Sequence, residues 1–262
     1  MKILILIGSY RKNGNTDRLV NLIAAHLQAE AERCNTALEL ETLYLGHLAI
    51  APCRGCRACF DRGEDKCPLK DDLLAVRGKM QQADGLLIAS PVYVDDVSGY
   101  TKNWIDRLAF VCHRPGFAGK CAYLVATVGG SPTSHTLQTL HMALSTWGFY
   151  LAGQTGFKMG ALLPADEVKQ RFDAPAQKIA RRLFQAIYQR KFARPSFWAF
   201  MLFKIQQQAW QKAPPDGLDY RYWSEQGWLD PRREFYLPHT ANALKVALAR
   251  LTGSVIGKFV GG

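Results

Sequence analysis

The sequence of 262 residues lacks any uninterrupted apolar run of the roughly 18 residues that a membrane-spanning helix needs. Its opening apolar stretch, residues 3–7, is far too short for the core of a secretory signal peptide, and a glycine loop follows it. Neither a fixed-period repeat nor a low-complexity linker is present. Because 48% of the residues are hydrophobic, we expect a packed, soluble, cytoplasmic protein.

Acidic side chains are scarce, since 22 Asp and Glu stand against 33 Lys and Arg and give a formal net charge of +11. Residues 161–262 hold 16 of these bases and 8 of the acids, so the excess is concentrated there. A basic surface attracts nucleic acid, anionic lipid or an acidic partner. The chain carries no nucleic-acid-binding motif, however, and we interpret the excess as a solvated basic face.

The seven cysteines are an odd number and too unevenly spread for a disulfide framework. Four of them crowd into one short segment, at Cys53, Cys56, Cys59 and Cys67. In a cytosolic protein such a group indicates metal binding or redox activity. The others are scattered, and Cys121, which opens an apolar strand pattern, is expected in the core.

Strand and helix patterns alternate along the first 190 residues. Apolar runs predict strands at residues 2–7, 38–43, 85–90, 121–128 and within 149–157. Apolar residues at helical spacing predict a helix after each strand. The first is capped by Asn15 or Thr16 and the second by Asp71 or Asp72, and the others are expected at 102–109, 137–147 and 166–190. Five such units predict an α/β fold, a doubly wound five-stranded parallel sheet with right-handed crossovers.

Beyond residue 190 the pattern changes to clusters of aromatic side chains, with one closing helix expected within 241–258. We expect residues 1–190 to form the α/β domain and residues 191–262 a helical, aromatic-rich extension that packs on it or on a second subunit. The extension is either a structural brace or a functional lid. A further alternative is that it touches a membrane surface through an apolar face at Phe197–Phe203.

Polar residues crowd the loop after the first strand. Ligands of open parallel sheets bind outside the carboxyl ends of the strands, where a helix N-terminus favours an anion. The loop matches neither Gly-x-Gly-x-x-Gly nor the Walker A motif, which weighs against a dinucleotide or a nucleoside triphosphate. It predicts a phosphate site built from hydrogen-bond donors, one positive charge and a permissive glycine: Ser9, Arg11, Asn13, Gly14, Asn15 and Thr16.

Two more loops are expected at the same edge of the sheet. Ser90-Pro91-Val92-Tyr93 follows the third strand, and its tyrosine can stack on a planar ring. Thr127-Val128-Gly129-Gly130 follows the fourth strand and offers small residues and backbone amides to the polar edge of the same ring. The order of the three loops, more than any one of them, predicts a single crevice for a ring that carries a phosphate.

On these motifs the sequence resembles the NADPH-dependent FMN reductase family of flavodoxin-like proteins, and within it the iron-sulfur flavoproteins. The resemblance covers about residues 1–160 and includes Gly-Ser-x-Arg-x-x-Gly-Asn-Thr, Pro-Cys-x-Gly-Cys-x-x-Cys and Ser-Pro-Val-Tyr. It implies FMN held at its phosphate by Ser9, Arg11, Asn13, Asn15 and Thr16, along its isoalloxazine by Pro91, Val92 and Tyr93, and at its pyrimidine side by Thr127, Gly129 and Gly130.

The resemblance also implies an oxidoreductase that passes electrons from NAD(P)H through FMN to a flavin, quinone or similar acceptor, and a homodimer or tetramer. No catalytic acid or base is required, because the cofactor does the chemistry. The alternative is an iron-sulfur flavoprotein that relays electrons between protein partners. Lys102 and Asp106, four residues apart on a helix, are interpreted as a structural ion pair.

The spacing Cys53-x2-Cys56-x2-Cys59-x7-Cys67 leaves three alternatives open. Four thiolates can hold a [4Fe-4S] cluster, and nearby Arg and Lys side chains would offset its negative charge. Zinc usually prefers two separated Cys-x2-Cys pairs. Free or redox-active thiols are the third alternative, because some relatives carry only part of the pattern.

Overall fold

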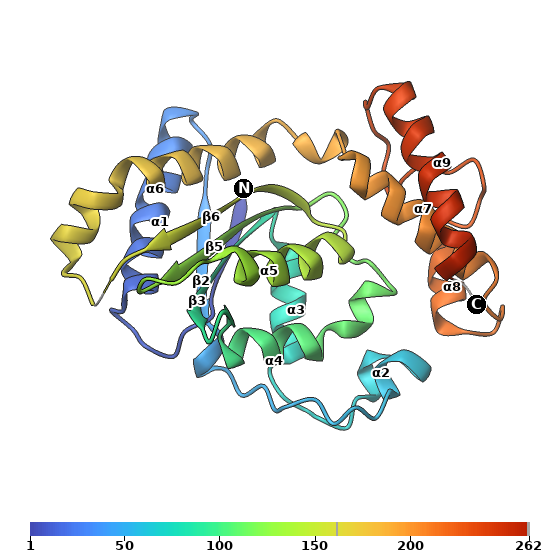
Figure 1. Cartoon of the computed structure of the whole chain (residues 1–262), viewed down its shortest axis with the longest axis horizontal. Coiled ribbons are helices and arrows are strands. Elements are labelled where there is room, and N and C mark those ends of the chain that lie inside the picture. Colours follow the sequence, from blue (N-terminus) through green and yellow to red (C-terminus); the bar gives the residue numbers. More distant parts are fainter. Residues whose placement is uncertain (161, 261–262) are drawn as a thin grey trace.

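The computed structural model describes residues 1–160 and 162–260 and places a parallel sheet between layers of helices (Figure 1). Its strands lie in the order β2-β1-β3-β5-β6, and each neighbouring pair is parallel. They are β1 (Lys2–Ile7), β2 (Glu39–Tyr44), β3 (Gly85–Tyr93), β5 (Cys121–Val128) and β6 (Tyr150–Lys158). This is the flavodoxin-like order of a doubly wound sheet, so the predicted fold is confirmed.

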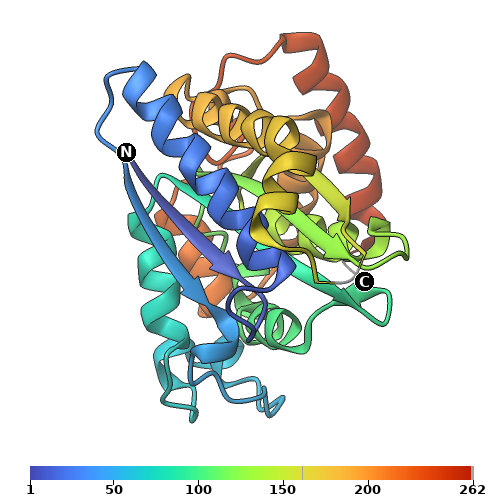
Figure 2. The ribbon, with the colours of Figure 1, turned by 90° about the vertical axis from the view of Figure 1, so that its left-hand side faces the viewer.

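Helices cover both faces of the sheet. On one face lie α1 (Asn15–Arg33) and α6 (Ala165–Tyr188), which run side by side in Figure 2. On the other lie α3 (Leu73–Gln82), α4 (Gly99–Arg107) and α5 (Ser134–Thr146). Alternate residues of β1 supply the two cores: Ile3 and Ile5 face α1 and α6, while Leu4 and Leu6 face the opposite core. Burial on both faces explains the continuous apolar run of β1.

The structure corrects two local expectations. The N-cap of α1 is Gly14 in an extended conformation, and not the side chain of Asn15 or Thr16. Residues 91–93 continue β3 instead of forming a loop. Pro91 lies in register with Thr127 of β5, and Tyr93 pairs with β4 (Asp96–Val97) in an antiparallel hairpin. These pairings extend the strand toward the region where a ligand was expected.

The segment between β2 and α3 carries the four grouped cysteines and a short helix, α2 (Ala58–Asp61). Single 3-10 turns occur at Leu45–His47, Glu64–Lys66, Ala109–Cys112 and Lys191–Ala193. Cys121, at the start of β5, is fully buried, as expected of a core residue.

Up to residue 260, the extension forms the helices α7 (Phe197–Gln211), α8 (Leu218–Glu225) and α9 (Ala243–Val260), at one end of the molecule beside α2 (Figure 1). Its aromatics make a third core, in which Phe200, Phe203 and Trp223 are fully buried. Of the apolar face expected at Phe197–Phe203, Phe200 and Phe203 are buried in this core, whereas Trp198 is 69% exposed. Contact with a membrane surface stays a prediction. Among the described residues, none of the helices is both long and apolar enough to cross a membrane.

Candidate functional site

A cavity of about 290 Å³ lies at the carboxyl ends of β1, β3, β5 and β6. Most of the residues predicted to bind FMN line it: Ser9, Arg11, Gly14, Asn15, Thr16, Pro91, Val92, Tyr93, Thr127 and Gly129. Asn13 and Gly130 are not among the lining residues. The strand order brings the three predicted segments together, since β3 lies between β1 and β5.

The loop between β1 and α1 is held close to the sheet. The N–H of Gly8 donates to the carbonyl of Ala89 at 2.7 Å, and a Cβ atom on Gly8 would lie 1.9 Å from Oγ1 of Thr101. Only glycine fits there. The N–H of Arg11 then donates to Oγ of Ser9 at 3.1 Å, which turns the loop toward the cavity.

Asp17, which no motif singled out, organises the far side of this loop. Its carboxylate is 2% exposed, and it accepts the N–H of Asn13 at 2.7 Å and the hydroxyl of Tyr44 at 2.6 Å. Asn13 has a φ of 58°, a left-handed conformation that Asn tolerates. Asn13 thus shapes the loop through its backbone. The sequence could have pointed to Asp17, because it is an acidic residue in the first turn of α1 and lies on the buried face of that helix.

The proton on Tyr44 supports this arrangement. Burial and the hydrogen bond to Asp17 raise the pKa of Tyr44 to about 12, so the phenol stays protonated and donates. The carboxylate of Asp17 therefore accepts hydrogen bonds from Asn13 in the loop and from Tyr44 of β2. On the cavity side, the first-turn N–H groups of α1 and the guanidinium of Arg11 supply the positive potential that favours an anion.

The opposite wall joins α1 to β5 and to the segment after β6. Oγ1 of Thr16 lies 2.6 Å from Oγ1 of Thr127, and Oδ1 of Asn15 accepts the N–H of Leu163 at 2.9 Å. This wall adds lining residues that the sequence interpretation missed: Val128, Met159, Gly160 and Leu162. The rule that placed ligands at strand ends applies equally to β6, which neighbours β5.

Tyr93 is presented by a tight turn. Its side chain is 56% exposed at the end of β3, beside the cavity. The two residues that follow, Val94 and Asp95, have φ values of 49° and 66° and connect β3 to β4. Two successive positive φ angles are typical of a type I′ hairpin turn, so the turn fixes where the tyrosine ring lies.

The four grouped cysteines line a second cavity, of about 110 Å³, bordered by α2, α3 and α4. Cys53 and Cys56 are exposed, while Cys59 and Cys67 are half-buried. All four thiols are free. Burial raises the pKa of Cys59, and the nearby Cys53 and Cys67 raise it further because neighbouring thiolates repel its charge. All four predicted metal ligands line this cavity. Among the residues that the structure describes, however, no three His, Cys, Asp or Glu side chains are placed so that they could hold a metal ion.

Arg107 anchors this segment to the domain. Its buried guanidinium donates to the carbonyl of Ala51 and to Oδ2 of Asp71, both at 2.6 Å, and Nη2 lies 3.9 Å from Sγ of Cys67. Burial alone would raise the pKa of Asp71, but hydrogen bonds from Arg107 and from backbone N–H groups outweigh it and lower that pKa. The neighbouring pair Lys102–Asp106, 2.6 Å apart and exposed, is the predicted structural ion pair.

Comparisons with known proteins agree on a family. The NADPH-dependent FMN reductase family model matches residues 1–161. An iron-sulfur flavoprotein of Methanosarcina thermophila is 33% identical over 172 residues, which cover 64% of this chain and 85% of that protein. Another, from Archaeoglobus fulgidus, is 25% identical over 234 residues, 87% of this chain and 100% of that protein.

Among solved structures, RosB with bound 8-demethyl-8-formylriboflavin-5′-phosphate superposes with a TM-score of 0.59. The alignment covers 73% of this chain and 80% of that one, at 14% identity. At this identity the likeness supports the fold alone.

Proposed function

Because the chain belongs to the NADPH-dependent FMN reductase family, we propose that it passes electrons from NAD(P)H, through FMN, to a flavin, quinone or similar acceptor. Family membership makes it an FMN-dependent oxidoreductase. What we propose beyond this is the electron donor, the class of electron acceptor and the residues that bind FMN. A homodimer or tetramer also belongs to it, and light scattering of the purified protein tests that assembly.

The observation that carries the proposal is the cavity at the strand ends. Its lining offers hydroxyls, amides and one guanidinium at the N-terminus of α1, which is the donor set that a phosphate monoester needs. We assign the phosphate to the lining residues Ser9, Arg11, Gly14, Asn15 and Thr16. Asn13, also predicted for the phosphate, would act through the shape of the loop. Pro91, Val92 and Tyr93 would hold the isoalloxazine ring, and Thr127 and Gly129 its pyrimidine side. Gly130, predicted for the same side, follows them directly in the chain.

The chemistry that bound FMN supplies is hydride and single-electron transfer. The residues of this chain bind and orient the group. Arg11 would neutralise the phosphate charge, and Tyr93, which lines the cavity and is partly exposed, would stack on the ring. The turn at Val94–Asp95 and the pairing of Tyr93 with Asp96 fix the backbone that presents this tyrosine.

Neighbouring cations in the loop provide a test. Arg11 lines the cavity and Lys12 does not, so Arg11→Met should weaken FMN binding at least tenfold, while Lys12→Met should change it less than threefold. Fluorescence titration of FMN into the flavin-free protein measures both. Steady-state oxidation of NADH and NADPH, with free FMN or a quinone as acceptor, tests the activity. Equal losses in the two variants would contradict the phosphate assignment.

A second candidate function is electron relay between proteins through FMN and an iron-sulfur cluster, and the cysteine cavity favours it. Each iron of a [4Fe-4S] cluster takes its own cysteine, so the ligands need to surround a space. Zinc requires four ligands about 2.3 Å from one point. Zinc also usually prefers two separated Cys-x2-Cys pairs, which the spacing of the four cysteines here does not form. We therefore propose Cys53, Cys56, Cys59 and Cys67 as cluster ligands.

An ultraviolet-visible spectrum of anaerobically purified protein, with iron and zinc analysis, tests the cluster. We expect flavin bands together with a broad shoulder in the visible region and about four irons per chain. Flavin without iron after anaerobic reconstitution would refute the cluster. Fast reduction by ferredoxin, with slow oxidation of NAD(P)H, would favour the relay over the reductase.

A further inference from the structure

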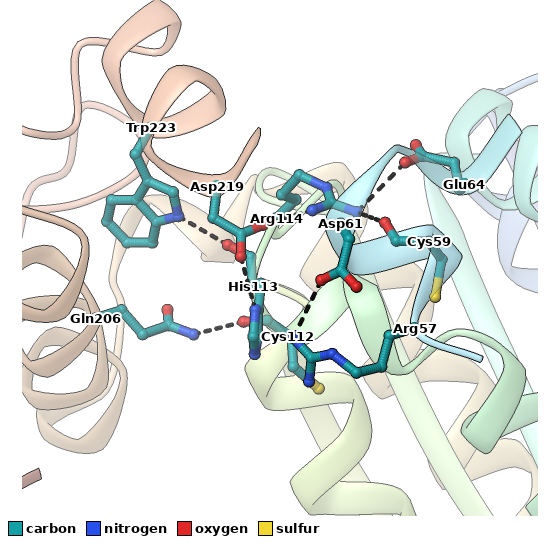
Figure 3. Close-up of polar contacts among 10 residues, drawn as sticks. All are labelled: Arg57, Cys59, Asp61, Glu64, Cys112, His113, Arg114, Gln206, Asp219 and Trp223. Carbon is teal, nitrogen blue, oxygen red and sulfur yellow. Dashed lines mark hydrogen bonds and ion pairs between the residues drawn. The ribbon is translucent and has the colours of Figure 1, made fainter. Parts of the chain in front are cut away.

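Residues 112–115, which begin at the last residue of the 3-10 turn Ala109–Cys112, form one of the contacts between the extension and the domain (Figure 3). Three side chains of the extension bind carbonyl groups of this short segment. Gln206 Nε2 donates to the carbonyl of Cys112 at 2.7 Å, and Trp223 Nε1 to that of His113 at 2.8 Å. The hydroxyl of Tyr222 donates to the carbonyl of Pro115 at 2.7 Å. The extension thus satisfies backbone groups that the domain leaves unpaired.

Arg114, within this segment, links the extension to the cysteine segment. It is only 6% exposed. Its Nη2 donates to the carbonyl of Cys59 at 2.5 Å and lies 3.5 Å from Oε2 of Glu64, whereas Nη1 pairs with Asp219 of α8 (Figure 3). One guanidinium therefore joins three parts of the chain that are far apart in sequence.

The partners of Arg114 are themselves held in place. Asp219 also pairs with Nδ1 of His113 at 2.8 Å, and Glu64 pairs with Arg77 of α3 at 3.0 Å. The rings of His113 and Phe60 meet edge-on, with centroids 4.8 Å apart, so the cysteine segment packs on the same contact. A planar group with five donors can serve all these acceptors at once, which an ammonium group cannot do.

We propose that the extension holds the cysteine segment in position through Arg114, with Arg114 and Asp219 as positioning residues for Cys59. None of the residues in this network lines the cavity assigned to FMN. The extension is thus a brace for the cysteine cavity and not a lid over the flavin. That the extension also positions an iron-sulfur cluster rests on the proposed function. That it holds the cysteine segment does not.

The test uses the full-length protein with Asp219→Asn, which is isosteric and removes the charge that the extension contributes. Arg114→Lys is the second variant, which retains the charge but offers fewer donors. Asp61→Asn is the matched control, because Asp61 lies in the same segment and, among the described residues, its side chain pairs only with the exposed Arg57, at 3.1 Å. Hydrogen exchange of peptides spanning residues 53–67 is measured by mass spectrometry, with α1 as the internal reference.

We expect exchange in residues 53–67 to accelerate at least tenfold in Asp219→Asn and in Arg114→Lys, and less than twofold in Asp61→Asn. Exchange in α1 and the FMN content should stay at the wild-type level in all three variants. If the cluster is present, its electron paramagnetic resonance signal should broaden or shift in the first two variants only. Unchanged exchange at 53–67 in Asp219→Asn would overturn the brace. Absence of iron in the wild type would refute only the proposed cluster. The hydrogen exchange of residues 53–67 would still decide whether the extension holds the cysteine segment.

Discussion

Asp17 ties the proposed phosphate loop to the body of the domain, although it lies outside the loop itself. Its buried carboxylate holds the N–H of Asn13 and the hydroxyl of Tyr44. Hydrogen bonds to a charged group are worth about 1.5–3 kcal/mol, so their loss should loosen the loop. We expect Asp17→Ala to raise the Kd for FMN about tenfold, or about 1.4 kcal/mol, in a fluorescence titration.

The exposed carboxylate Glu32, on the same helix, provides the control for this substitution. Glu32→Ala should leave the Kd for FMN within a factor of two. A normal FMN affinity in Asp17→Ala would show that the loop holds its shape without the carboxylate.

Asp71 makes stability dependent on pH through its pair with Arg107. Its pKa is lowered in the folded state, so the stability that it contributes is present above the ordinary carboxyl pKa of 3.8. That contribution is lost as the pH falls through the lower, folded value. Asp71→Asn should cost about 3 kcal/mol at pH 7, since it leaves a buried guanidinium without a counter-charge.

The difference between wild type and Asp71→Asn should shrink in acid, because the wild-type carboxyl is then protonated as well. Urea unfolding at a series of pH values from neutral to below the folded pKa measures it. A difference that stays constant as the pH falls would mean that Asp71 contributes through shape and not through charge.

The strands were the elements best predicted from the sequence. β1 and β5 have the expected bounds, because burial on both faces leaves a continuous apolar run. The start of α1 was predicted less well, since its cap is the backbone of Gly14 and not a side chain. The extension of β3 through Tyr93 was missed because its partner, β4, has only two residues and no strand pattern of its own.

The hairpin between β3 and β4 contains a strained residue beside the proposed flavin site. Val94 is β-branched, fully exposed and left-handed, with a φ of 49°. This conformation costs such a residue about 1–2 kcal/mol, whereas Asn adopts it readily in type I′ turns. Val94→Asn should therefore raise the free energy of unfolding by about 1 kcal/mol, measured by urea denaturation. Val94→Ile retains the branch and should bring no gain, so equal stabilisation by both would argue against relief of backbone strain.

Spacing along the chain indicated which residues gather at the strand ends and in the cysteine segment, because each set belongs to short local motifs. That these sets bind FMN or a metal stays a prediction. Spacing did not predict what joins them to the rest of the molecule. Arg114 and Asp219 are 105 residues apart, and Arg107 and Asp71 are 36 apart. A charged side chain in a single sequence carries no mark of a distant partner, so buried ion pairs of this kind become visible only in three dimensions.

The hydrophobic core of the extension is separate from the two cores on the faces of the sheet. A substitution in it should therefore destabilise the extension without changing the flavin site. Phe203 is fully buried between Trp223 and Tyr236, in the core of the extension. Phe203→Ala should cost that core about 3–5 kcal/mol, because truncating a buried aromatic leaves a cavity. Tryptophan fluorescence should then report earlier unfolding of the extension in urea. FMN affinity should stay within a factor of two, since no residue of this core lines the strand-end cavity. A parallel loss of FMN affinity would mean that the extension and the flavin site unfold as one cooperative unit.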